Sequence, residues 1–105
     1  MNKKFSAQEL HDIRNAIPIR FLIEEVLSIP SKEVEGIFRF VCPCCREFQT
    51  AINPKTNLSR CFLCRRNFNT IEIFMADRKE SFVPAVKILQ SYLPDQAASA
   101  TMHVL

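Results

Sequence analysis

Residues 42–64 read CPCCREFQTAINPKTNLSRCFLC, and this stretch decides the fold. It holds two C-x2-C pairs, Cys42 with Cys45 and Cys61 with Cys64, which are separated by 15 residues. A C-x2-C pair in a tight turn directs two thiolates at one metal ion, and two such pairs joined by a hairpin complete a tetrahedron. The spacing predicts one Zn²⁺ bound by these four cysteines, in preference to an iron–sulfur cluster, a redox pair or unliganded core cysteines.

The remaining cysteine, Cys44, leaves a second choice of ligands open. The pair Cys42 and Cys45 has the spacing of a metal-binding turn, whereas Cys44 would give a C-x-C or a vicinal pair, so we expect Cys44 to be a bystander. The histidines His11 and His103 lie far from both pairs in the sequence, and we expect both to be solvated. Four cysteines leave no position for water, which predicts a structural zinc ion and no catalytic site.

Length and composition favour one small cytoplasmic domain. The 105 residues are 48% hydrophobic and 24% charged, which suits a single domain over residues 1–93, with residues 94–105 as a disordered tail. No apolar run is long enough to span a membrane, and the first residues lack the apolar core of a signal peptide. We expect no membrane association, no small-molecule substrate and no catalytic activity of the chain's own.

Helices are predicted on both sides of the cysteine stretch. Ser6 with Glu9 forms a capping pattern for a first helix, and Pro18 opens a second one that ends before Pro30. Asn69 with Glu72 predicts a cap for a third helix. A fourth helix is expected after Ser81, and its stripe of Phe82, Val86, Leu89 and Leu93 ends at Pro94.

Between these helices the sequence favours strands. The runs 37–41, 48–52 and 58–62 are rich in β-branched and aromatic residues, and the turn-forming segment 53–57 separates the last two. The predicted fold class is therefore α+β: a zinc ribbon-like antiparallel sheet of three or more strands, flanked by N-terminal and C-terminal helices.

From about Ile13 to Leu93 the sequence resembles the zinc-binding domain of bacterial replicative DNA primases of the DnaG type. The shared features are the helix before the first pair, Cys42-Pro43 and Cys45, Phe48, Pro54-Lys55, Cys61-Phe62 with Cys64, and the segments 69–75 and 82–89. Cys45 stands where that family has a histidine ligand, the segment after it is shortened to Arg46-Glu47, and Leu63 and Arg65 replace glycines.

The resemblance implies that the chain binds a single-stranded DNA template during primer synthesis. Primases carry a polymerase domain and a helicase-binding domain after this module, and 105 residues have no room for them. We therefore expect an accessory role beside a primase, polymerase or other replication protein on another chain.

The charge pattern agrees with a nucleic-acid partner. Between Gly36 and Phe68 there is one acid, Glu47. The expected DNA-binding residues in this region are Arg39, Arg46, Lys55, Arg60, Arg65, Arg66 and Phe62, with Phe38, Phe40, Phe48 and Phe68 interleaved. Three alternatives stay open. Some arginines neutralise the zinc–thiolate centre. Many of the phenylalanines belong to the core, because a domain this small has few other large apolar groups. Or the chain is a protein-interaction adaptor that uses exposed Phe62, Leu63 and Phe68.

Glycine is nearly absent, since Gly36 is the only one. Tight metal-binding turns commonly need a residue with positive φ, which glycine tolerates best and asparagine next best. We therefore expect Asn57 and Asn67 to adopt the left-handed conformation.

Overall fold

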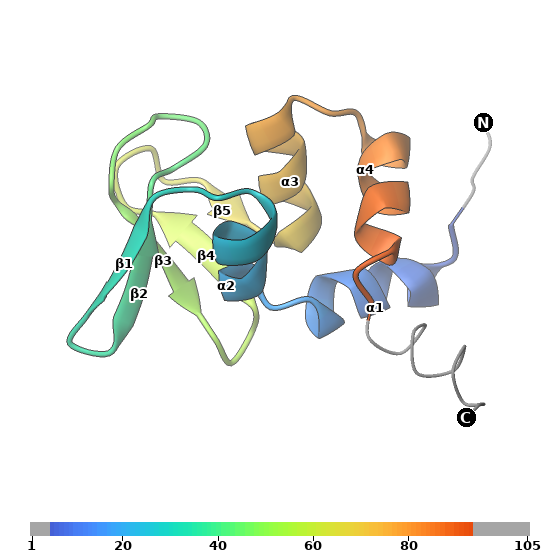
Figure 1. Ribbon diagram of the computed structural model, residues 1–105, viewed down its shortest axis with the longest axis horizontal. Helices are drawn as coiled ribbons and strands as arrows, with labels where there is room; N and C mark the ends of the chain where they lie inside the picture. Colours follow the sequence, from blue (N-terminus) through green and yellow to red (C-terminus); the bar gives the residue numbers. More distant parts are fainter. Residues whose placement is uncertain (1–4, 94–105) are drawn as a thin grey trace.

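A five-stranded antiparallel sheet and four α-helical segments build the fold in the computed structural model, which describes residues 5–93 (Figure 1). The elements are α1 (Ala7–Ala16), α2 (Ile19–Phe21), the π-helical turn η1 (Leu22–Val26), β1 (Ser31–Val34), β2 (Ile37–Phe40), β3 (Thr50–Asn53), β4 (Leu58–Cys61), β5 (Asn67–Phe68), α3 (Thr70–Arg78) and α4 (Phe82–Gln90). The predicted α+β class is confirmed. The expected tail at 94–105 and His103 lie outside the described residues.

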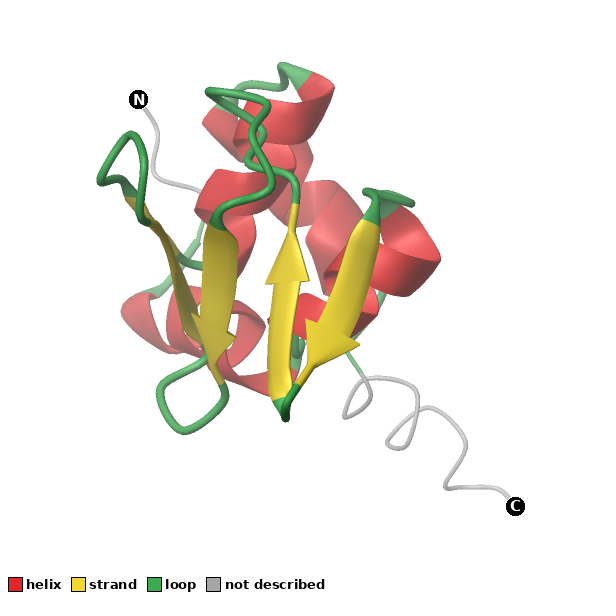
Figure 2. Cartoon of the chain, turned by 90° about the vertical axis from the view of Figure 1, so that its left-hand side faces the viewer, coloured by secondary structure: helices red, strands yellow, loops and turns green. Residues whose placement is uncertain are grey.

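The sheet has the strand order β1-β2-β3-β4-β5 and uses its two faces differently. Figure 2 shows the strands toward the viewer and the helices behind them. The face toward the helices, called here the inner face, carries Phe38, Phe40 and Phe68, which are buried with Ile73 of α3 and Leu89 of α4 in one core. The opposite outer face has no helix packed on it within the described residues.

Two of the predicted helix starts are confirmed in detail. At α1 the Glu9 backbone N–H donates to Ser6 Oγ (3.0 Å), and the Ser6 N–H donates to the Glu9 carboxylate (2.8 Å). Asn69 and Glu72 form the same reciprocal pair at α3, with distances of 2.8 and 2.9 Å. These bonds satisfy N–H groups that a helix start otherwise leaves free. Ser81 precedes α4 as expected, but its side chain makes no capping hydrogen bond.

The second helix differs from the expected regular helix. After the three residues of α2 the backbone widens into η1, in which the Leu27 N–H donates to the Leu22 carbonyl (2.9 Å). Ser28 then takes a left-handed φ of 54° and ends the helix before Pro30. A left-handed residue followed by proline is a common helix stop, so the predicted end is right although the winding is not.

Two strands were not predicted. β1 pairs with β2 through a two-residue turn in which Glu35 and Gly36 have φ values of 53° and 78°. Positive φ at both positions is the geometry of a type I′ hairpin, which glycine at the second position favours. Gly36 therefore marks a hairpin as well as the start of a strand. β5 has only two residues and forms the other edge of the sheet.

The expectation for left-handed asparagines is half right. Asn57 has φ 54°, and its side chain connects the β3–β4 turn to the N-terminal helices: Oδ1 accepts from the Ile19 N–H (3.0 Å) and Nδ2 donates to the Ile17 carbonyl (2.8 Å). Asn67 lies in β5 and has no positive φ. The left-handed conformation that we expected at Asn67 occurs instead at Arg46 and Arg65.

Candidate metal centre and sheet surface

The two C-x2-C segments fold into two turns of the same geometry, which we call the first knuckle (42–47) and the second knuckle (61–66). In the first, the Arg46 N–H donates to the Cys42 carbonyl (2.9 Å) and the Cys42 N–H donates to the Glu47 carbonyl (2.9 Å). In the second, the corresponding bonds join Arg65 to Cys61 (2.8 Å) and Cys61 to Arg66 (2.9 Å).

Each knuckle closes through a left-handed residue directly after its second cysteine. These residues are Arg46, with φ 67°, and Arg65, with φ 65°. The left-handed conformation is strained for a residue with a Cβ, so glycine would be the least strained choice at both positions. The left-handed positions thus lie within the knuckles and carry arginine, which is why Asn67 is not needed for this role.

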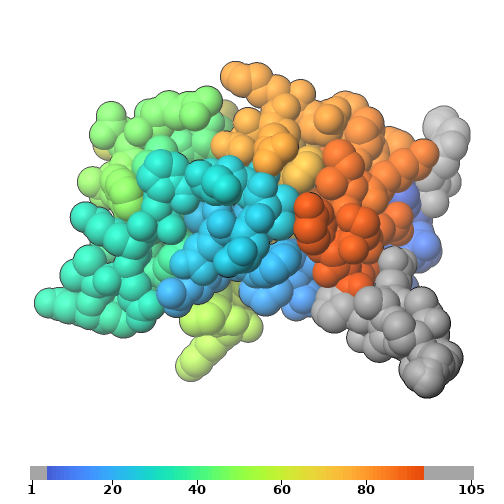
Figure 3. All heavy atoms as spheres, in the orientation of Figure 1, coloured from blue at the N-terminus to red at the C-terminus, as the bar shows by residue number. Residues whose placement is uncertain are grey.

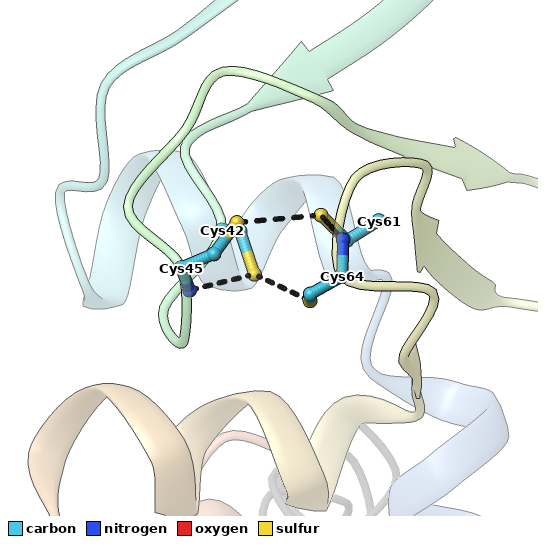
Figure 4. A group of neighbouring side chains, drawn as sticks. All are labelled: Cys42, Cys45, Cys61 and Cys64. Carbon is cyan, nitrogen blue, oxygen red and sulfur yellow. Dashed lines mark hydrogen bonds between the residues drawn. The ribbon is translucent and has the colours of Figure 1, made fainter.

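The structure brings together the sulfurs of Cys42, Cys45, Cys61 and Cys64, all within 4.8 Å of one another (Figure 4). The Cys42 and Cys64 sulfurs are 3.8 Å apart, and the Cys45 and Cys61 sulfurs are 3.6 Å apart. A tetrahedron with Zn–S bonds of about 2.3 Å has sulfurs about 3.8 Å apart along each edge. The four cysteines therefore form a cluster whose donor type and size fit a tetrahedral metal ion.

Backbone N–H groups point at the sulfurs from within each knuckle. Cys42 Sγ accepts from the N–H of Cys44 (3.4 Å) and of Cys45 (3.5 Å), and Cys61 Sγ accepts from the N–H of Cys64 (3.4 Å). Such bonds orient the ligand atoms and stabilise their negative charge. Cys42 and Cys61 are buried, whereas Cys45 and Cys64 are half-buried at the surface side of the cluster.

The thiols influence one another's ionisation. Burial acts to raise the pKa of Cys61, but the N–H groups of Cys64 and Leu63 and the neighbouring thiols outweigh it and lower the pKa to about 6. At Cys45 the Glu47 N–H acts to lower the pKa, but burial and the adjacent Cys61 and Cys42 raise it to about 12. One thiolate among the cluster thus disfavours a second, and a bound divalent cation would reverse that effect.

The two other candidate groups lie apart from the cluster. Cys44 is exposed, and its sulfur does not belong to the group within 4.8 Å. The ring of His11 lies in α1 beside the Asn15 side chain (3.3 Å) and is also exposed. Neither side chain offers a further metal ligand to the four-sulfur cluster.

The predicted nucleic-acid residues fall on three regions. Arg46, Arg65 and Arg66 belong to the knuckles and are exposed, and Lys55 is exposed in the β3–β4 turn. Arg39 and Arg60 lie on the outer face of the sheet. There the strand register aligns one row across all five strands, made of Lys32, Arg39, Ala51, Arg60 and Asn67.

Lys32 is the member of this row that the sequence reasoning missed, because strand β1 was not predicted. Its ammonium lies 5.0 Å from the ring centre of Phe48, a cation–π contact beside the row. The other outer-face side chains are Val34, Ile37, Asn53 and Leu58, so no acid occurs on this face of the five strands. The signal that could have revealed Lys32 is the Glu35-Gly36 turn.

Three of the interleaved phenylalanines belong to the core, as one of the open alternatives held. Phe38, Phe40 and Phe68 point inward and are buried, because alternation along a strand sends every second side chain to the core. Phe62 is 56% exposed and Leu63 57% exposed in the second knuckle. The adaptor surface named from sequence therefore lacks Phe68, and Phe62 is the exposed aromatic of the expected set.

No helix within residues 5–93 is long and apolar enough to cross a membrane. No model of a known protein family matches the chain, and no curated protein matches it. What the chain does must therefore be inferred from the four-sulfur cluster, the outer face and the knuckles themselves.

Proposed function

We propose that the chain is a zinc-stabilised module that binds single-stranded DNA on the outer face of its sheet. The ligands of one structural Zn²⁺ are Cys42, Cys45, Cys61 and Cys64, a set with sulfur donors only and tetrahedral spacing, as Zn²⁺ prefers. The bound ion supplies crosslinking of the two knuckles and no chemistry on a substrate, since four thiolates fill its coordination.

The observation that carries the DNA-binding proposal is the acid-free outer face with its row of cations. Lys32 and Arg39 are register partners on the neighbouring strands β1 and β2. Arg60 lies in the same row on β4, with Ala51 of β3 between it and Arg39. Phe62 lines the same hollow as Arg60 and Asn67 of this row and offers an exposed ring. Cations that follow the phosphates and an aromatic ring that stacks on a base are the usual parts of a single-strand binding surface.

The knuckle arginines support the same proposal. A ZnS4 centre carries a formal charge of −2, and nearby arginines offset it, so the knuckles do not repel a polyanion. Arg46 and Arg65 hold strained backbone positions that glycine would fill with less strain. The presence of an exposed cation at both positions favours a role for the side chains beyond folding.

The resemblance to the primase zinc-binding domain fits this surface, and we propose an accessory role in primer synthesis. In this role the chain holds the template strand, and the polymerase chemistry comes from a partner chain.

The test is fluorescence anisotropy of a labelled single strand over a series of salt concentrations. Each phosphate contact contributes about −0.7 to the slope of log K against log salt. We expect Lys32→Gln and Arg60→Gln each to reduce the slope by about 0.7, and the double variant by about twice that amount. Lys87→Gln, on the exposed side of α4, is the matched control and should leave the slope unchanged.

A specific observation favours a second function, a protein-interaction adaptor. Phe62 and Leu63 are adjacent and more than half exposed at the second knuckle. In that case the affinity for the protein partner does not depend on salt concentration. Leu63→Asp abolishes partner binding, whereas Lys32→Gln and Arg60→Gln leave it unchanged. Weak binding of the single strand, with an affinity that does not change with salt in the wild type, Lys32→Gln or Arg60→Gln, would favour the adaptor.

A further inference from the structure

A hollow of about 350 Å³, called here the edge pocket, opens between the first knuckle, the second knuckle and α3. Figure 3 shows the green atoms of residues in the forties bordering the gold atoms of α3 along the upper edge of the molecule. The pocket is lined by the cations Arg66 and Lys79, by apolar side chains that include Met75, and by the exposed thiol of Cys44. None of these side chains belongs to the four-sulfur cluster.

The edge pocket continues the outer face. A second hollow of about 390 Å³ lies over β3, β4 and β5, with Arg60 and Phe62 in its lining, and Asn67 lines both hollows. Arg60 donates to the Asn67 side-chain oxygen (3.0 Å), which joins the end of the cationic row to the edge of the sheet. A strand that crosses the outer face therefore reaches the edge pocket by passing β5.

The charges of the pocket select what enters it. Two cations, Arg66 and Lys79, are balanced by Glu72 and Glu80, so the pocket does not favour a group with several negative charges. Glu72 already accepts the Asn69 N–H at 2.9 Å. The Glu80 carboxylate has no hydrogen-bond or ion-pair partner within residues 5–93, and it is free to accept a hydrogen bond from an amino group. One phosphodiester would match the cations Arg66 and Lys79, and one base with an amino group would match Glu80.

Lys79 stands at a position that normally takes glycine. It ends α3 with φ 54°, the left-handed conformation that glycine commonly supplies after a helix. The side chain nevertheless lines the pocket. The strained position therefore carries a cation, as in the two knuckles.

We propose that the edge pocket binds one nucleotide of the strand held by the outer face. The phosphodiester contacts Arg66 and Lys79, the base packs on Met75, and an amino group of the base donates to Glu80. This inference rests on the proposed single-strand binding and extends it to a base-selective site that the sheet alone does not provide.

Cys44 supplies a direct probe of occupancy. The zinc-loaded protein is alkylated with N-ethylmaleimide with and without an oligodeoxycytidylate of about 12 nucleotides, within the site size of small single-strand binding domains. With the oligonucleotide at ten times its Kd, we expect the labelling rate of Cys44 to fall about tenfold. Cys44→Ser identifies the labelled position, and zinc content measured after labelling verifies that the four ligands stay bound.

Two variants test the contacts, and both are read by anisotropy. Lys79→Gly relieves strain and removes the cation, so we expect the salt slope to drop by about 0.7 with the fold intact. Ser28→Gly is the matched control, because Ser28 has the same φ of 54° and no charge. We expect oligodeoxycytidylate to bind about tenfold tighter than oligodeoxythymidylate, which lacks the amino group, and Glu80→Ala to abolish this preference.

The outcomes separate this inference from the proposed function. If the oligonucleotide binds with a steep salt slope but Cys44 labels at an unchanged rate, and Lys79→Gly behaves like Ser28→Gly, the edge pocket is not part of the site and the outer face alone is. Equal affinity for the two oligonucleotides would overturn the contact with Glu80. Absence of any binding overturns both proposals.

Discussion

At the scale of single residues, the left-handed arginines are the clearest departure from an unstrained chain. We expect Arg65→Gly to leave the free energy of unfolding unchanged or to raise it by up to about 1 kcal/mol, because relief of Cβ strain exceeds or balances the entropy that glycine adds to the unfolded chain. Urea unfolding of the zinc-loaded protein measures this effect. Leu63→Gly, in the same knuckle but without positive φ, should instead lower stability by about 1 kcal/mol.

Equal losses in the two variants would show that Arg65 stabilises the knuckle through its side chain. In that case the arginine at the left-handed position would need no functional reason, and the support that it lends to the DNA-binding proposal would be withdrawn.

Buried hydroxyl groups offer a second prediction at this scale. Thr50 is fully buried, and its hydroxyl has no hydrogen-bond partner within the described residues. Thr50→Val should therefore leave stability unchanged or raise it by up to about 1 kcal/mol.

Thr70 is equally buried, but its hydroxyl donates to the Ile17 carbonyl (3.1 Å) and accepts from Asn57 (3.2 Å). Thr70→Val should lower stability by about 1–3 kcal/mol in the same thermal or urea unfolding experiment.

At the scale of elements, a metal ion held by the four cysteines would join the two knuckles into one unit. We expect Cys61→Ser to lose the bound zinc and most of the folded population, because the ion's binding energy contributes directly to folding. Cys44→Ser should keep about one zinc per chain and a normal unfolding midpoint. Metal analysis of the purified proteins together with circular dichroism checks both results. Loss of zinc from Cys44→Ser, with zinc kept in Cys45→Ser, would reassign the ligand set.

At the scale of the whole molecule, removal of the metal should unfold the sheet and the helices together. The core is continuous from the helices through Phe40 to Cys42 and Cys61, so the cluster and the core share residues. We expect a chelator to cause cooperative loss of folded structure and of single-strand binding. Circular dichroism and anisotropy on the same sample measure these two losses. Intact binding after complete zinc removal would contradict the structural role of the ion.

The pH dependence of metal binding follows from the same cluster. Each ligand must lose its proton, and the pKa of Cys45 is raised to about 12, so metal binding at neutral pH displaces a proton from this thiol. Zinc affinity should therefore fall as the pH is lowered, and more steeply below pH 6, where Cys61 also becomes protonated without the metal. Competition with a chromophoric chelator over this range measures the effect. An affinity independent of pH would exclude thiolate ligands.

The sequence by itself determined what depends on local spacing: the two C-x2-C pairs, the capped starts of α1 and α3, the end of the second helix before Pro30 and the α+β class. The tertiary structure decided what depends on pairing between distant segments. Register placed Lys32 in line with Arg39 and Arg60, and alternation turned Phe38, Phe40 and Phe68 inward. Because a shift of one residue exchanges the two faces of a strand, the sequence could name the cations and rings but not which of them share the outer face.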